Sequence, residues 1–212
     1  MVITYQGGEF VKLQFGDITL ACNPVSKNSK LPQTRFGADV CLVSADHPDF
    51  NGSEQVAHGE KKPFIIDGAG EYEVKGIFIQ GFGSKTNFGG KESINTIYKI
   101  VLEGMNICFL GALSDQEISK EADEALDNID ILFVPIGGNG VLDPSKAYKL
   151  AVSLEPKLII PIHFGEISDN KDALKTFLKE AGESATPVDK LTLKKKDLDG
   201  KEGDVVVLQA VS

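Results

Sequence analysis

The order of the apolar segments is the feature of this sequence that most constrains its fold. The first half consists of short β-prone runs separated by turns that contain glycine, such as Gly7-Gly8 and Gly16-Asp17. The second half alternates strand-like runs with helical segments, which is the pattern of strand–helix–strand units. This order predicts an α/β fold in which two sheets carry helices on their outer faces.

The individual elements follow from apolar periodicity and from turn and cap residues. The polar segment 23–33 is expected to be a loop, and the glycine-rich segment 83–92 a mobile loop. Residues 83–90 of it could form a lid or merely a disordered loop. No linker or repeat divides the sequence, so a single domain over residues 1–212 is expected. The predicted strands cover 2–5, 10–15, 18–22, 39–44, 64–67, 71–74, 77–81, 96–102, 107–110, 129–136, 157–162, 190–196 and 204–210, and the predicted helices cover 119–126, 145–154 and 171–181.

Composition excludes several classes of protein. The net charge of −9 opposes binding to a phosphate backbone, so a nucleic-acid partner is not expected. No apolar run has the roughly 18 residues that a membrane span needs, and the first residues lack the features of a signal peptide. We therefore expect a cytoplasmic protein without a membrane partner. Cys22, Cys41 and Cys108 lie in apolar runs without a CxxC spacing, which predicts buried free thiols.

Two strand ends carry the residues that could do chemistry. His47 and Asp49 follow the apolar run 39–44, and His163 follows the run 157–162. Active-site residues often lie on loops at the carboxyl ends of buried strands. Two histidines and one carboxylate could bind Zn²⁺ or Fe²⁺ with open positions for water. A histidine at a strand end can equally be a hydrogen-bonded structural residue, and the residues alone leave both interpretations open.

Several motifs, in the right order, resemble the metallo-β-lactamase superfamily, in particular its small bacterial branch of metal-dependent hydrolases. The resemblance covers residues 1 to about 165 and implies a four-layer αββα sandwich. The motifs are ITYQG at the start, GADVCLVS before the first candidate loop, GEYEVKGI, LFVPIGGN followed by Asp143-Pro144, and PKLIIPIHFG around His163.

The family's metal ligands transfer only in part. Its H-x-H-x-D-H motif falls on residues 45–50, where Ala45 and Phe50 replace the outer histidines. Its mid-chain histidine falls near residues 84–86, where Lys85 is the nearest candidate, and its bridging aspartate falls at Gly111-Ala112. The resemblance therefore implies a degenerate motif, in which His47, Asp49 and His163 remain as metal ligands. Asp46 or Asp115 could add a carboxylate.

Two functions stay open at this point. The resemblance implies a hydrolase of esters, amides or phosphoesters with at most one weak metal site. That site would bind zinc or stay without a metal. In this hydrolase, Asp49 would be the catalytic residue and would also orient the attacking water. The alternative is a non-catalytic protein that keeps the fold to bind an unknown small molecule or to form a homo-oligomer. In the metal-free case, Asp49 caps a turn, His47 contacts the neighbouring strand, and His163 forms an ion pair with Asp49.

Overall fold

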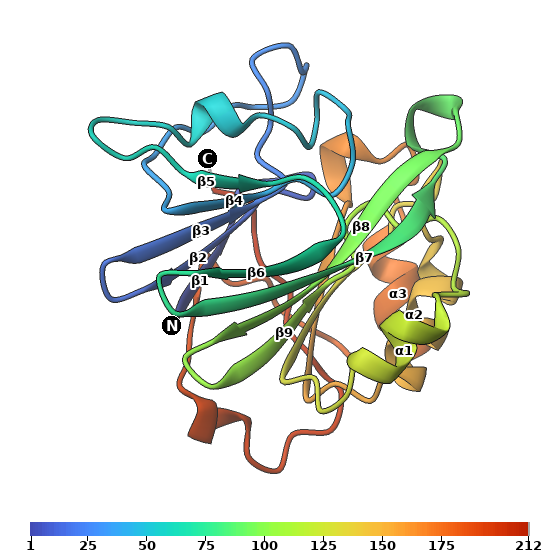
Figure 1. Cartoon of the computed structure of the whole chain (residues 1–212). Coiled ribbons are helices and arrows are strands. Elements are labelled where there is room, and N and C mark those ends of the chain that lie inside the picture. The colour runs from blue at the N-terminus through green and yellow to red at the C-terminus, as the bar shows by residue number, and fades with distance from the viewer. Residues whose placement is uncertain (212) are drawn as a thin grey trace.

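Two β-sheets packed face to face form the body of the protein, and three α-helices lie against one of them (Figure 1). The computed structural model describes residues 1–211. The α/β fold with two sheets agrees with the order of apolar segments in the sequence. None of the helices within the described residues has the length and apolar character needed to span a membrane.

The first sheet contains six strands and is mixed. Its strands are β1 (Val2–Tyr5), β2 (Val11–Phe15), β3 (Ile18–Cys22), β4 (Val40–Leu42), β5 (Phe64–Ile66) and β12 (Leu191–Thr192), in the spatial order β12-β1-β2-β3-β4-β5. The glycine turns make β1, β2 and β3 antiparallel neighbours, whereas β4 and β5 run parallel to β3. Gly7 and Gly8 both have positive φ angles, which glycine adopts without strain.

The second sheet contains seven strands and is also mixed. Its strands are β6 (Gly70–Val74), β7 (Ile77–Thr86), β8 (Ser93–Leu102), β9 (Met105–Phe109), β10 (Ile131–Pro135), β11 (Leu158–Ile162) and β13 (Asp204–Val205), in the order β13-β11-β10-β9-β8-β7-β6. The β6–β9 part is antiparallel, and the β9–β13 part is parallel because helices connect its strands.

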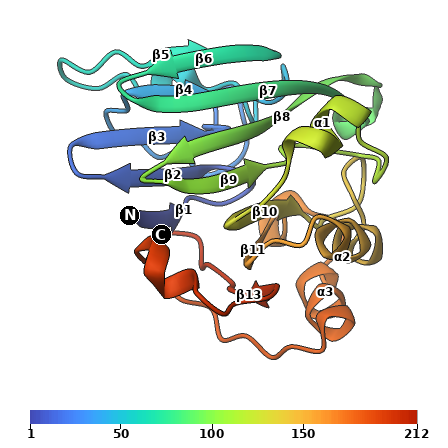
Figure 2. The ribbon, with the colours of Figure 1, turned by 60° about the horizontal axis from the view of Figure 1, so that its bottom comes forward.

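The helices are α1 (Lys120–Ala125), α2 (Pro144–Ser153) and α3 (Ala173–Ala181). The side chain of Asp143 accepts a hydrogen bond from the Lys146 amide and caps α2, which has Pro144 in its first turn. Gly182 ends α3 in the left-handed conformation, as the sequence predicts. All three helices pack on the outer face of the seven-stranded sheet (Figure 2).

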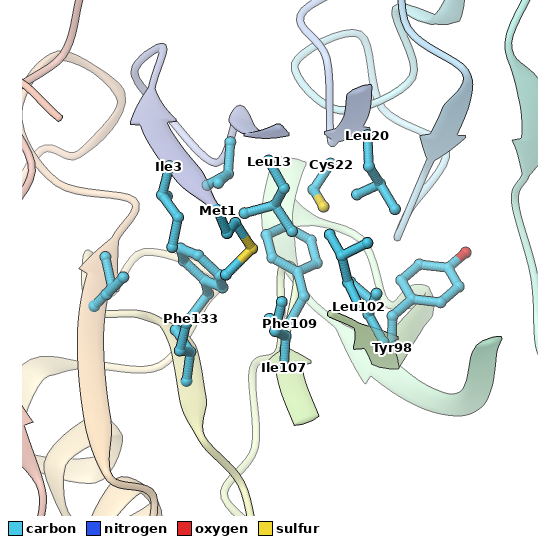
Figure 3. Close-up of a cluster of buried hydrophobic side chains, with 14 of the residues drawn as sticks. Met1, Ile3, Leu13, Leu20, Cys22, Tyr98, Leu102, Ile107, Phe109 and Phe133 are labelled. Atoms are coloured by element: carbon cyan, nitrogen blue, oxygen red, sulfur yellow. The ribbon is translucent and has the colours of Figure 1, made fainter. Parts of the chain in front are cut away.

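The main core fills the space between the sheets. Side chains that point inward from both sheets meet there, among them Leu13 and Leu20 from the first and Phe109 and Phe133 from the second (Figure 3). The period of two along each strand places these residues on the same face. This core fixes the two sheets relative to each other, so the loops at their ends are held in defined positions.

Three expectations about the elements need correction. The outer face of the six-stranded sheet is covered by a long loop with one short 3₁₀ turn, Ser53–Gln55, rather than by an α-helix within the described residues. The expected mobile loop 83–92 begins as part of β7, which continues to Thr86 because it pairs with β8. The expected strand 190–196 is only β12, followed by a 3₁₀ turn at Lys195–Leu198.

Candidate functional site

Three loops converge at one end of the two sheets and bring the candidate residues together. The loop after β4 carries His47 and Asp49, and the residue after β11 is His163. The third loop joins β7 to β8 and carries Phe88 in a short 3₁₀ turn, Phe88–Gly90. The ring of Phe88 contacts both imidazoles, so these loops form one site.

His163 is the most constrained residue of the site. Its side chain is buried, its φ angle is +59°, and its amide donates to the carbonyl of Gly8 over 2.7 Å. Gly137 lies directly against it, since a Cβ atom there would be 2.3 Å from the His163 carbonyl oxygen. A left-handed conformation at a non-glycine residue is strained and persists only where its surroundings hold it. The backbone therefore fixes the direction of this imidazole.

A buried carboxylate holds the His163 ring from one side. Glu9 Oε1 lies 2.6 Å from His163 Nδ1, and Glu9 is fully buried. Asn23 Nδ2 donates to Glu9 Oε2 over 2.7 Å, while Asn23 Oδ1 accepts the Ser44 amide over 2.7 Å. This network orients the carboxylate and leaves Glu9 Oε1 for the imidazole. His163 thus pairs with Glu9, and the expected ion pair with Asp49 is wrong.

The other nitrogen of His163 has no such partner. His163 Nε2 is buried and makes no hydrogen bond to any residue whose side chain the structure describes. When Nδ1 carries the proton shared with Glu9, the lone pair of the neutral ring is on Nε2. A buried nitrogen without a partner is costly, and such groups in folded proteins are rare. The site therefore contains one buried imidazole nitrogen that no described side chain satisfies.

His47 and Asp49 form a separate local pair. The Asp49 amide donates to His47 Nδ1 over 3.2 Å, and Asp49 Oδ2 lies 3.7 Å from the same nitrogen. The hydroxyl of Ser29 donates to the other carboxylate oxygen of Asp49. Since His47 Nδ1 accepts the amide proton, the proton of the neutral ring is on Nε2. The Nδ1 of this imidazole is thereby engaged by its own loop.

Phe88 fills the space between the two histidines. The centroid of its ring is 4.8 Å from that of His47 and 5.0 Å from that of His163, and both contacts are edge-to-face. Phe50 packs against the same ring at 5.0 Å. The surrounding residues are small or apolar: Ala45, Ala112, Val141 and Ile167. The centre of the site is consequently apolar.

The other carboxylates near this loop face elsewhere. Asp46 accepts from the side chain of Asn51, and Asp115 accepts from the amide of Glu117. Lys85 pairs with Glu92 at the surface over 3.1 Å. His58 lies exposed on the loop before β5. The contacts of these residues give none of them a role at the centre of the site.

Sequence reasoning missed Glu9, Asn23 and Phe88. Glu9 is a charged residue directly before Phe10 in an otherwise buried segment, and this is the one signal that could have revealed it. Its partner lies 154 residues away, so no local pattern identifies the pair. Phe88 was hidden in a glycine-rich segment that resembled an exposed loop.

The comparisons with known proteins agree with this fold. The model of a family described as "Beta-lactamase superfamily domain" matches residues 2–163. The chain belongs to the metallo-β-lactamase superfamily. A metal-dependent hydrolase of the UPF0173 group from Ligilactobacillus salivarius is 23% identical over 210 residues, which cover 87% of this chain and 94% of the relative.

Two solved structures resemble this superfamily member over nearly its whole length. A protein from Thermotoga maritima, described as a Zn-dependent hydrolase of the metallo-β-lactamase superfamily, is 28% identical with a TM-score of 0.76, over 98% of this chain and 97% of the other. A metallo hydrolase from Ignicoccus hospitalis shares the fold at 15% identity, with a TM-score of 0.67 over 100% and 96% of the two chains.

The donor set does not fit the metal that the superfamily implies. A catalytic zinc needs three protein ligands and an open position. Among the residues whose side chains the structure describes, no three His, Cys, Asp or Glu residues come together in such a group. The structure brings His47 next to Asp49 and both histidines against Phe88, but it does not bring His47, Asp49 and His163 around one point.

Proposed function

We propose that this superfamily member binds a small molecule at the site of Phe88 and does not hydrolyse it with a metal. The observation that carries the proposal is the position of the Phe88 ring between the imidazoles of His47 and His163. A metal shared by these histidines would need the space that the apolar ring fills. The motif is degenerate in this proposal, with Ala45, Phe50 and Ala112 in place of ligands.

The protonation pattern supports the same proposal. A histidine ligand presents an unprotonated nitrogen to the metal. His47 uses Nδ1 to accept an amide proton, and Asp49 accepts a hydroxyl proton from Ser29. His163 Nε2 is buried and has no partner among the described side chains, and it lies apart from the local pair of His47 and Asp49. One imidazole does not hold zinc against water, so the geometry favours an organic ligand.

A mononuclear metal-dependent hydrolase is the second candidate. The carboxylate of Glu9 on His163 Nδ1 is the arrangement that orients many metal-ligating histidines. Relatives that carry the name metal-dependent hydrolase support it as well. This candidate requires Phe88 to leave its position and the His47 loop to turn, so that His47, Asp49 and His163 share one ion.

Metal content separates the two candidates. Protein purified without a histidine tag is analysed for metals, and wild type, His163→Ala and the control His58→Ala are then titrated with Zn²⁺ and Mn²⁺. We expect no stoichiometric metal and no micromolar binding in any of the three. About one metal per chain in wild type and in His58→Ala, lost in His163→Ala, would establish the mononuclear centre instead.

A further inference from the structure

The further inference concerns the chemistry of the ligand, and it rests on the proposed function. One side of the space that Phe88 occupies is the imidazole of His163, whose buried Nε2 has no hydrogen-bond partner among the described side chains. The rest of the wall is formed by the rings of Phe50 and His47 and by the small apolar residues of the same cluster. A space of this kind accepts a flat apolar ring.

The polar atom determines what the ring must carry. Asn23 Oδ1 is fixed by the Ser44 amide, so Asn23 Nδ2 donates to Glu9 Oε2. The remaining oxygen of Glu9 lies 2.6 Å from His163 Nδ1 and accepts the ring proton. His163 Nε2 is then an acceptor, and a ligand that satisfies it must donate a hydrogen bond.

The segment that carries Phe88 is held to the neighbouring loops at Gly140 and Ser114. The Asn87 amide donates to the Gly140 carbonyl over 3.1 Å, and the Phe88 amide donates to Thr86 Oγ1 over 3.1 Å. Gly89 and Gly90, the next two residues, both have φ angles of +79°. The ion pair between Lys85 and Glu92 is exposed and contributes little. Displacement of the Phe88 ring therefore requires these backbone contacts to open and the ring contacts with Phe50, His47 and His163 to be replaced.

We propose that Phe88 is a displaceable ring, and that the ligand which replaces it is a neutral phenol-type molecule, an aromatic ring whose hydroxyl donates to His163 Nε2. The ligand takes over the contacts of the Phe88 ring with Phe50 and His47. It also satisfies the nitrogen that Phe88 leaves without a partner. Binding therefore gives His163 Nε2 a hydrogen-bond donor, which the Phe88 ring does not provide.

The first experiment measures phenol and benzene binding by calorimetry to wild type and to Phe88→Ala, in buffer with EDTA. We expect both proteins to bind phenol, with Phe88→Ala the tighter because no ring has to leave. In Phe88→Ala, phenol should bind about five- to tenfold more tightly than benzene, the value of one hydrogen bond between neutral groups. The control Phe109→Ala opens a cavity in the main core, away from His163, and should not prefer phenol.

A second variant tests the hydrogen bond itself. In Glu9→Gln the side-chain oxygen still faces Asn23, so the new amide group donates to His163 Nδ1 and the ring proton moves to Nε2. The double variant Glu9→Gln with Phe88→Ala should lose the preference for phenol over benzene and gain a preference for pyridine, which accepts a hydrogen bond. A merely structural role of Glu9 would not reverse this preference.

Spectroscopy on wild type keeps the test valid if Phe88→Ala does not fold. The ¹⁵N shifts of His163 should identify Nε2 as the unprotonated nitrogen, and phenol should move that shift. Hydrogen exchange of the Asn87 amide should become faster with phenol as the loop opens. The inference is overturned if wild type binds no phenol, if Phe88→Ala binds phenol and benzene equally, or if Nε2 is protonated. If the protein contains no metal and binds no phenol, the proposed metal-free function stands and only the phenol inference fails. If the protein contains stoichiometric metal, the proposed function and the phenol inference both fail.

Discussion

Glu9 Oε1 and His163 Nδ1 lie 2.6 Å apart in the interior, although 154 residues separate them in the sequence. The pair joins the turn between β1 and β2 to the end of β11, and so links the two sheets beside the site. Both side chains are withdrawn from water, where an unpaired polar group carries a large desolvation penalty. The pair therefore contributes to the stability of the fold as well as to the orientation of the imidazole.

Removing one partner should be strongly destabilising. We expect Glu9→Ala to lower the free energy of unfolding by about 3–5 kcal/mol, because His163 and Asn23 lose a buried partner. Urea denaturation followed by circular dichroism measures the change. The matched control is His47→Ala, whose partly exposed side chain should cost under about 1 kcal/mol. Equal effects of the two substitutions would mean that the buried pair does not stabilise this end of the sheets.

Gly137 should tolerate no side chain. Its neighbours leave no room, since a Cβ atom would lie 2.3 Å from the carbonyl oxygen and 2.7 Å from Cδ2 of His163. We expect Gly137→Ala to cost about 2–4 kcal/mol and to shift the His163 resonances in NMR spectra. Gly83→Ala is the control, because a Cβ atom there meets nothing within 4 Å. A neutral Gly137→Ala would show that the strained backbone at His163 can relax.

A third imidazole in place of the Phe88 ring should create a metal site. In Phe88→His the new ring would lie between His47 and His163, whose centroids are 4.8 and 5.0 Å from the present ring. Three imidazoles are a sufficient ligand set for zinc, so we expect about one zinc per chain at micromolar affinity. Isothermal titration would detect it, with Phe78→His on the exposed face of β7 as the control. Absence of binding would show that the three imidazoles cannot direct a nitrogen each to one point.

The sequence predicted those parts of the fold that depend on neighbouring residues, such as turns and helix ends. Glycine turns placed the first three strands, and Asp143-Pro144 and Gly182 placed helix ends at the observed positions. The end of β7 was missed because Lys85 and Thr86 belong to the sheet only through backbone pairing with β8. His47, Asp49 and His163 were singled out as candidates because they follow buried strands, and their role as metal ligands stays a prediction. Glu9 and Phe88 were not, because their roles depend on contacts that exist only after folding.

The three cysteines should be unreactive in the folded protein. Burial raises the pKa of the Cys22 and Cys108 thiols well above the ordinary value, and burial together with the charges of Glu54 and Asp67 raises the pKa of Cys41 to about 12. The thiolate is the reactive form, so little of it is present at neutral pH. We expect Ellman's reagent to label no thiol of the native protein within minutes and all three in guanidinium chloride. Rapid labelling of one thiol without denaturant would contradict its burial.

Asp39 should make the protein sensitive to acid. Burial of its carboxyl acts to raise the pKa, but hydrogen bonds from Lys61, Lys75 and the Thr19 amide outweigh burial and lower the pKa to about 2. In the unfolded chain the Asp39 carboxyl has its ordinary pKa of 3.8, so the ionised side chain stabilises the folded state at pH values above 3.8. The contribution of about 2 kcal/mol should disappear as the pH falls from about 4 to about 2.

The variant Asp39→Asn isolates this contribution. It should lower the free energy of unfolding at pH 7. It should also reduce the slope of stability against pH in the acid range without abolishing it, because the remaining carboxylates still titrate. Urea denaturation at a series of pH values measures both effects. Asp127→Asn is the control, since that carboxylate also pairs with a lysine but lies exposed at the surface, where the pair is screened. An unchanged acid slope in Asp39→Asn would mean that the two lysines do not hold this carboxylate in solution.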